Sequence, residues 1–73
     1  MLENLRALRE DKDIKQKDMA KFLDVHQTTY SDYELGQLNI PIDILVKLAT
    51  YFGTSVDYII GLTDERKPYP RKK

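Results

Sequence analysis

Apolar residues recur along this chain at the spacing of an α-helix, in short blocks that glycine, proline and aspartate separate. The clearest block places Leu45, Leu48, Ala49 and Phe52 at positions i, i+3, i+4 and i+7, which lie on one face of a helix. No segment shows the strict alternation of apolar and polar residues that a half-buried strand requires. The pattern predicts an all-α fold built from five short helices.

The residues between the blocks predict where these helices begin and end. Asp24 suits a sharp turn after the second helix, because aspartate tolerates a positive φ. Gly36 and Gly53 are typical residues at the C-terminal ends of helices, here the third and the fourth. Pro41 is expected in the first turn of the fourth helix, where its missing N–H does no harm. Ser55 is expected to cap the fifth helix.

The length of 73 residues allows one small domain and leaves no room for a second core. Because the chain has no cysteine and a single histidine, it cannot form a disulfide and is not expected to hold zinc. The sequence contains no recognisable nucleophile with a base, no carboxylate pair in a plausible pocket and no glycine-rich phosphate loop. We therefore expect neither an enzyme nor a bound metal or cofactor.

Charge is distributed unevenly along the sequence, although its formal sum is zero. Residues 1–63 carry seven basic and ten acidic side chains, or −3, whereas residues 64–73 carry five basic and two acidic, or +3. The second segment also contains two prolines, so we expect a folded domain over residues 1–63 and a basic flexible tail over residues 64–73. No apolar run approaches the roughly 20 residues of a membrane span, so we expect a cytoplasmic protein.

The expected third helix, residues 27–35, has two unlike faces. At about 100° per residue, its positions separate into two arcs. The first, here called the polar arc, has side chains that can hydrogen-bond to base edges, and it comprises Gln27, Thr28, Ser31, Asp32 and Leu35. The second, here called the aromatic arc, has two aromatic rings to bury and a carboxylate that needs a partner, and it comprises Thr29, Tyr30, Tyr33 and Glu34. Such a polar arc is typical of a helix that enters the major groove of DNA.

Several motifs, taken together, resemble one known family. They are QKDMA at the start of the second helix, YELG at the end of the third, and LVKLATYFGTSVDYII across the last two. Over about residues 2–61 the chain resembles the XRE (xenobiotic response element) family, which contains helix-turn-helix domains of the Cro and phage-repressor type. The resemblance implies a compact bundle of five helices in which the second and third form the helix-turn-helix.

The resemblance also implies roles for individual residues. The base-reading positions are Gln27, Thr28 and Asp32, with Ser31 nearby. Contacts with DNA phosphates are expected from Lys15, Gln16, Lys17, His26, Gln37 and Asn39. Gln16 is also expected to buttress the third helix. A buried salt bridge is expected to tie the first helix to the third through Arg9 and Glu34. Surplus apolar residues in the last helix point to a homodimer interface formed by Val56, Tyr58, Ile59 and Leu62.

Five positions depart from the family pattern, and one of them is Asp24, which replaces the usual glycine of the turn. Lys15 and His26 stand where a helix-capping Ser or Thr is usual, a loss of typically about 1 kcal/mol each. Leu35 stands where a phosphate-binding Asn is common, which weakens the expected anchoring. Asp32 is acidic where Arg, Lys or Gln is more usual, so it repels phosphates but can accept a hydrogen bond from cytosine N4.

From these features we expect a sequence-specific DNA-binding transcriptional regulator, a repressor that binds double-stranded DNA as a homodimer. The alternative is an antitoxin or other protein-interaction module of the same fold, with a toxin as its partner and weak or no DNA binding. The net acidic body of the chain and the departures at Asp32 and Leu35 favour this alternative. The two hypotheses differ in salt dependence, because only a DNA binder releases counterions from duplex DNA.

Overall fold

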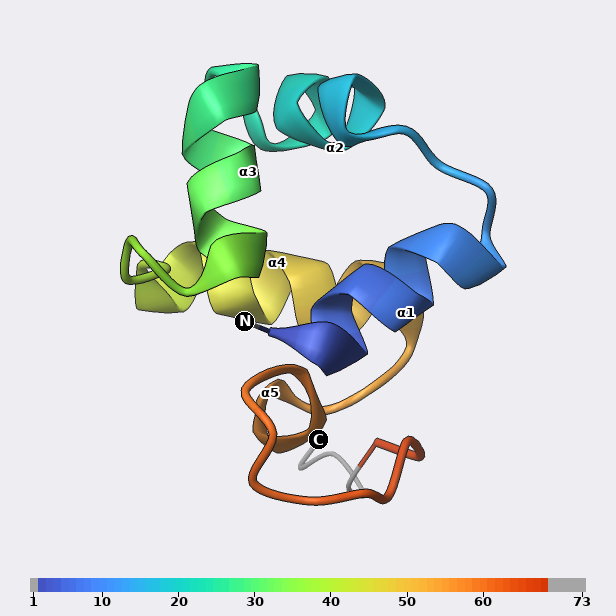
Figure 1. Cartoon of the computed structure of the whole chain (residues 1–73). Helices are drawn as coiled ribbons and strands as arrows, with labels where there is room; N and C mark the ends of the chain where they lie inside the picture. The colour runs from blue at the N-terminus through green and yellow to red at the C-terminus, as the bar shows by residue number, and fades with distance from the viewer. Residues whose placement is uncertain (1, 69–73) are drawn as a thin grey trace.

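The structure is a computed structural model in which residues 2–68 are described. It contains five helices, shown in Figure 1: α1 (Glu3–Asp11), α2 (Gln16–Leu23), α3 (Gln27–Leu35), α4 (Ile42–Phe52) and α5 (Val56–Ile59). No strand occurs within residues 2–68, and the predicted all-α fold of five helices is confirmed.

Three helices end at a residue in the left-handed conformation. The φ angle is 58° at Asp24 after α2, 75° at Gly36 after α3 and 64° at Gly53 after α4. Glycine adopts this conformation without strain and aspartate does so more readily than most other residues, so the chain can turn sharply at each point. The predicted ends of α2, α3 and α4 are therefore confirmed.

The beginnings of the last two helices agree with the sequence only in part. Pro41 does not lie in the first turn of α4 as expected; it is the N-cap, and the helix begins at Ile42. A proline φ suits both positions, and the extended ψ of 150° places Pro41 outside the helix. Ser55 caps α5 as predicted, since its Oγ accepts a hydrogen bond from the Tyr58 N–H at 3.0 Å.

All five helices contribute side chains to one hydrophobic core. Its buried members lie at helical spacing on the inward face of each helix, and they are Leu5, Leu8, Met19, Ala20, Leu23, Tyr30, Tyr33, Leu48, Ala49 and Ile59. Five of these side chains are almost completely buried, among them Tyr30 of α3 and Ile59 of α5. Burial of this apolar surface is the main force that holds such short helices together, because isolated helices of this length are marginal in water.

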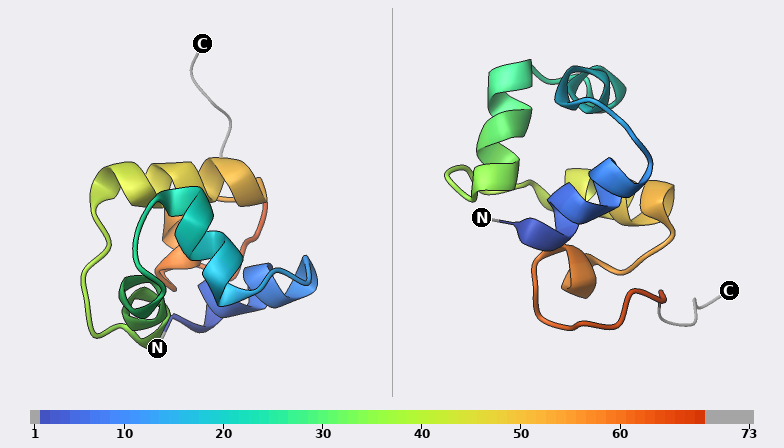
Figure 2. Two further views of the ribbon diagram at one scale, coloured as in Figure 1. Left: turned by 90° about the horizontal axis from the view of Figure 1, so that it is seen from above. Right: turned by 45° about the vertical axis from the view of Figure 1, so that its right-hand side comes forward.

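The helices are arranged so that α2 and α3 form one end of the molecule and α5 forms the other (Figure 1). Seen from above, α2 crosses over the middle of the bundle between α1 and α4, and α3 is viewed nearly along its axis (Figure 2). The backbone N–H of Leu2 donates to the carbonyl oxygen of Glu34 at 2.7 Å, which fixes the start of the chain against the end of α3. The helix-turn-helix pair therefore stands on a base formed by α1, α4 and α5.

Two predictions concern the end of the chain. The boundary between a domain at residues 1–63 and a tail at residues 64–73 stays a prediction, and residues 69–73 of that tail lie outside the described residues. Residues 60–68 contain no helix. Within the described part of the chain, no helix has the length and apolar character needed to cross a membrane.

Candidate nucleic-acid interface

Helices α2 and α3 meet through a short turn at Asp24, Val25 and His26. The Val25 N–H donates to the carbonyl oxygen of Ala20 at 2.9 Å, which closes the end of α2. Val25 is half-buried against the core, and Asp24 and His26 are exposed. The short turn and its left-handed residue fix the direction of α3 relative to α2, as in a helix-turn-helix.

The polar arc of α3 faces outward. Gln27 and Thr28 are exposed at the N-terminal end of the helix, and Ser31 and Asp32 are half-buried one turn later. Leu35, at the C-terminal end, has 42% of its surface exposed. The four residues predicted to read bases therefore lie on one face, and their donor and acceptor groups can reach a partner laid against it. Whether they contact DNA stays a prediction.

The aromatic arc of the same helix faces inward. Tyr30 is 0%, Tyr33 is 5% and Glu34 is 3% exposed, and only Thr29 is half-buried. Two aromatic rings and one carboxylate of α3 are thus buried against the rest of the domain. A buried carboxylate is costly unless it is paired and hydrogen-bonded, so the surroundings of Glu34 matter.

Glu34 is held by side chains from two other helices. Arg9 Nε donates to Glu34 Oε2 at 2.6 Å, and Arg9 Nη2 donates to Glu34 Oε1 at 3.2 Å. Gln16 Nε2 donates to the same Oε1 at 3.1 Å, and Arg9 Nη1 donates to the carbonyl oxygen of Ile14 at 2.8 Å. The two-point contact between a guanidinium and a carboxylate is directional and strong. Arg9, Gln16 and Glu34, which we call the anchor network, therefore join α1, α2 and α3.

The anchor network sets the charge state of its members. Burial alone would raise the pKa of Glu34, but hydrogen bonds from neighbouring side chains, first of all Arg9, lower it below its usual value. The hydrogen bond to Glu34 raises the pKa of Arg9. Burial, and next the Glu34 carboxylate, raise the pKa of Tyr30, whose hydroxyl is buried and makes no well-formed hydrogen bond with a described residue. The pair is therefore ionised and Tyr30 is neutral at neutral pH.

The N-terminal ends of α2 and α3 lack side-chain caps. Lys15 and His26 have the extended backbone of N-cap residues, but neither side chain accepts a hydrogen bond from the following helix. The expected loss of both caps is therefore seen in the structure. The first N–H groups of these helices have no side-chain acceptor from the cap, and such groups are suited to bind phosphate oxygens.

The residues predicted to contact phosphates lie on both sides of α3. Lys15 and Lys17 are exposed at the beginning of α2, and Gln37 and Asn39 are exposed in the loop after α3. Gln16 is half-buried because its amide is bound to Glu34. The sequence has no Lys or Arg between residues 22 and 46, so α3 itself carries no positively charged lysine or arginine.

The predicted dimer residues separate into different environments. Val56 and Tyr58 are half-buried and Leu62 is 74% exposed. The prediction was wrong for Ile59, which is 0% exposed because its side chain fills the core beneath α5 and has no surface left for a second chain. The neighbouring Ile60 is the exposed residue of this turn, and the spacing of apolar residues alone did not separate the two.

Ile60 borders a shallow apolar groove that the sequence did not indicate. Its volume is about 340 Å³, and it is lined by Leu2, Gly36, Leu38, Asn39, Ile40, Leu45 and Ile60. The groove begins at the C-terminal end of α3, at Gly36, and reaches the turn after α5. Leu38 on its rim is 45% exposed. An uncharged surface of this kind suits contact with protein better than contact with DNA.

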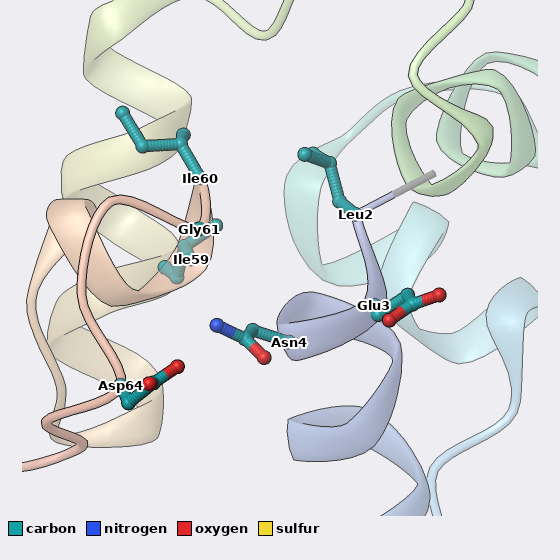
Figure 3. A pocket seen from close by; sticks show the side chains of 7 residues that line it. All are labelled: Leu2, Glu3, Asn4, Ile59, Ile60, Gly61 and Asp64. Atoms are coloured by element: carbon teal, nitrogen blue, oxygen red, sulfur yellow. The ribbon is translucent and has the colours of Figure 1, made fainter.

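A second pocket, of about 230 Å³, lies between the start of α1 and the turn after α5 (Figure 3). Asn4 points into it from α1, and its Nδ2 donates to the carbonyl oxygen of Tyr58 at 2.7 Å. Glu3 and Asp64 stand on opposite walls. No group of three or more side chains of the metal-binding types comes together anywhere in residues 2–68.

Comparison with known proteins places these features in context. The model of a family described as Helix-turn-helix matches residues 5–59. The chain is 35% identical over 71 residues to the "Uncharacterized HTH-type transcriptional regulator YobD" of Bacillus subtilis (strain 168), covering 97% of this chain and 63% of that protein. It is 33% identical over 58 residues to the "SPbeta prophage-derived uncharacterized HTH-type transcriptional regulator YonR" of the same organism, covering 80% of this chain and 54% of that protein.

A third relative, the "Uncharacterized HTH-type transcriptional regulator YqaE" of Bacillus subtilis (strain 168), is 31% identical over 65 residues, which is 88% of this chain and 56% of that protein. The chain thus spans between about half and two thirds of the length of these relatives. No solved structure matches the chain significantly.

Proposed function

The chain belongs to the XRE-type helix-turn-helix family of transcriptional regulators, and from this membership we propose that it is a repressor which occupies a specific operator as a twofold dimer. The observation that carries the proposal is the division of α3 into a buried aromatic arc and an outward polar arc. A helix fixed on one side and polar on the other is what insertion into a major groove requires.

Base recognition is assigned to the polar arc. Gln27 and Thr28 lead the helix into the groove, and a glutamine amide can make two hydrogen bonds with adenine. Ser31 can donate to or accept from several bases, so it adds contact with little selectivity. Asp32 is the selective position, because a carboxylate accepts from cytosine N4 and repels every group that is itself an acceptor.

Phosphate contacts are assigned to the two flanks of the polar arc. Lys15 and Lys17 with the free N–H groups of α2 serve one flank, and Gln37 and Asn39 serve the other. Gln16 has a double role, since its amide is bound to Glu34 and can turn a further N–H toward a phosphate. Because few of these contacts are cationic, the affinity for non-specific DNA is expected to be low, which favours selection of an operator over bulk DNA.

The dimer is assigned to the surface on which Leu62, Val56 and Tyr58 lie, extended by Ile60 and the groove beside it. Leu62 is 74% and Ile60 is 39% exposed, so the turn after α5 offers apolar surface that a second chain can cover. A twofold dimer presents two copies of α3 to successive major grooves about 34 Å apart. The operator is therefore expected to be an inverted repeat.

The deciding experiment is selection of randomised duplex DNA by the purified chain at low salt, followed by sequencing of the retained molecules. We expect enrichment of an inverted repeat whose half-sites are one helical turn apart. The affinity for that repeat should then fall with salt, with a log-log slope of about −0.9 for each phosphate neutralised. A folded protein that enriches no sequence would contradict operator recognition.

The second candidate function is a protein-interaction module such as an antitoxin. It is favoured by the lack of cations in α3 and by the exposed apolar surface at Leu35 and Leu38. An antitoxin would be expected to form a stable complex with the product of a neighbouring toxin gene. Co-expression with that gene product, followed by size-exclusion chromatography, distinguishes this function from operator binding alone.

A further inference from the structure

After α5 the chain turns back and lies against the base of the molecule. Thr54 is 2% exposed in the loop before α5, and its Oγ1 donates to the carbonyl oxygen of Arg66 at 2.7 Å. A buried hydroxyl must find an acceptor to avoid a desolvation cost, and here the acceptor is the backbone of a segment that the sequence predicts as tail. The segment is therefore attached at a defined point.

The side chain of Arg66 attaches the same segment to two helices. Arg66 Nη2 lies 2.6 Å from Asp11 Oδ2, at the last residue of α1. Its guanidinium carbon lies 5.8 Å from the centre of the Tyr58 ring in α5, within the range of a cation–π contact. Together with Thr54, these contacts join one residue to α1, to α5 and to the loop between α4 and α5.

Residues 63–67, which we call the strap, also have internal hydrogen bonds. Thr63 Oγ1 accepts from the Glu65 N–H at 3.1 Å, and Glu65 Oε1 accepts from the Lys67 N–H at 3.1 Å. Such local bonds between a side chain and a nearby N–H are typical of ordered turns. They limit the conformations of the strap, so less conformational entropy is lost when Arg66 makes its contacts with Asp11 and Tyr58.

Asp11 links the strap to the candidate DNA surface. It is the last residue of α1, and the loop that follows it leads to Lys15 and Lys17 at the start of α2. The Asp11 side chain is 60% exposed, so without Arg66 its negative charge would act on any polyanion bound to those lysines. Arg66 is thus placed to neutralise a carboxylate at the end of α1, from which the chain leads to the start of the helix-turn-helix.

We infer that residues 63–67 are a structural part of the folded domain, and that through the Arg66–Asp11 contact they raise its affinity for DNA. The first half of this inference is independent of the proposed function, and the second half rests on it. It assigns residues 63–67 to the base of the molecule, on the side of α5 in Figure 1, rather than to an arm that lies on DNA.

The first experiment tests the strap by thermal unfolding of the whole chain. Thr54→Val keeps the shape of the side chain and removes the donor, and we expect the Tm to fall by about 4–8 °C. Thr50→Val, at an exposed position of α4, is the matched control and should change the Tm much less. Equal shifts in Tm for the two variants would overturn the proposal that the strap is a structural part of the domain. They would show that the bond between Thr54 and Arg66 contributes nothing to stability.

The second experiment measures binding to the enriched operator at low salt. Arg66→Ala should weaken binding by roughly two- to fivefold, as expected for an exposed ion pair. Adding Asp11→Asn to that variant should restore the affinity, because the unneutralised carboxylate is then removed. Lys67→Ala removes the same charge one residue further on and should have a smaller effect.

The outcomes separate the two halves of the inference from the proposed function. If Lys67→Ala weakens binding as much as Arg66→Ala, or if Asp11→Asn restores nothing, the role of the strap in DNA binding is overturned. If the wild-type chain selects no operator, the proposed function fails together with that role. The thermal comparison of Thr54→Val with Thr50→Val still decides whether the strap belongs to the domain.

Discussion

The two arcs of α3 consist of neighbouring residues, but one arc is buried and the other lies at the surface. On the aromatic arc, Tyr30 is 0% exposed and Glu34 has hydrogen bonds from two other helices. On the polar arc, Gln27 and Thr28 are exposed to solvent. The first arc is fixed by contacts in the interior of the protein, whereas the side chains of the second lie at the surface.

The comparison teaches that stability and recognition are separated by about half a turn of one helix. Removing a buried group costs free energy through cavities and unpaired charge. Removing an exposed polar group changes stability little but removes a donor or acceptor from the proposed interface. Substitutions on the two arcs should therefore change different measured quantities, and the following five predictions test this division.

The largest effect is expected from Glu34→Ala. It leaves the Arg9 guanidinium partly buried without its carboxylate, and we expect a loss of about 3–5 kcal/mol of unfolding free energy. Urea unfolding measures it. Glu10→Ala is the control, because Glu10 pairs with Arg6 at 3.5 Å while both side chains are half exposed, so its loss should be within about 1 kcal/mol. Equal losses would mean that burial does not distinguish the two pairs.

Acid should weaken the aromatic arc selectively. Because the pKa of Glu34 is lowered in the folded protein, its contribution to stability is fully present above the ordinary glutamate pKa of 4.5. That contribution is lost as the pH falls below 4.5 and through the lowered folded pKa. Urea unfolding at successive pH values measures the loss. Glu34→Gln should flatten this part of the pH profile, and an unchanged profile would contradict the assignment.

Asp32→Ala should change recognition rather than stability. We expect tighter binding to non-specific duplex DNA and the loss of about 1–3 kcal/mol of discrimination at one base pair, which the selected operator should show as C·G. Fluorescence anisotropy with operators altered at single positions measures both quantities. A large fall in Tm with unchanged base preference would show that Asp32 contributes to stability, as the aromatic arc does, and not to recognition.

His26→Ser changes the N-cap residue of α3, which precedes both arcs. A serine in this extended position can accept from the N–H groups of the first turn, so the protein should gain about 1 kcal/mol of stability. The base preference should stay the same, because the change precedes the polar arc. Thermal unfolding and repeated selection are the measurements, and a decrease in Tm would show that His26 has an interaction of its own to lose.

The smallest effect is expected from Leu35→Asn. Leu35 is 42% exposed, and an amide at this position can donate to a phosphate, for a gain of about 0.5–1.5 kcal/mol on all duplexes alike. Leu38→Asn is the matched control, since Leu38 is 45% exposed but lies beyond the helix, on the rim of the apolar groove. A gain that depends on sequence would instead place Leu35 among the base-reading residues.

Much of the fold could be predicted because each helix has its own local signal. Leu45 and Leu48 marked the inward face of α4, and Asp24 and Gly36 marked turns that require a positive φ. The sequence did not show that Ile59 lies in the core and Ile60 at the surface, because α5 has only four residues and its spacing does not define a face.

The candidate site was predicted less completely for a different reason. The polar arc follows from the geometry of one helix. The contact of Gln16 with Glu34 joins residues 18 positions apart, so only the family resemblance, and no local pattern, implied that Gln16 buttresses α3. The contact of Arg66 with Asp11 joins residues 55 positions apart. No local pattern indicates it, because the same sequence is equally compatible with a free tail. Long-range polar contacts of this kind depend on the assembled tertiary structure.

The anchor network also limits how small a working fragment of this protein can be. A peptide that contained only α2 and α3 would keep the turn and the polar arc, but it would lack Arg9, which belongs to α1. Glu34 would then lose its only cationic partner in the network, and Tyr30 and Tyr33 would lose the base on which they pack. The helix-turn-helix is therefore a unit of recognition but not a unit of folding, and it cannot be excised as a miniature reader of DNA.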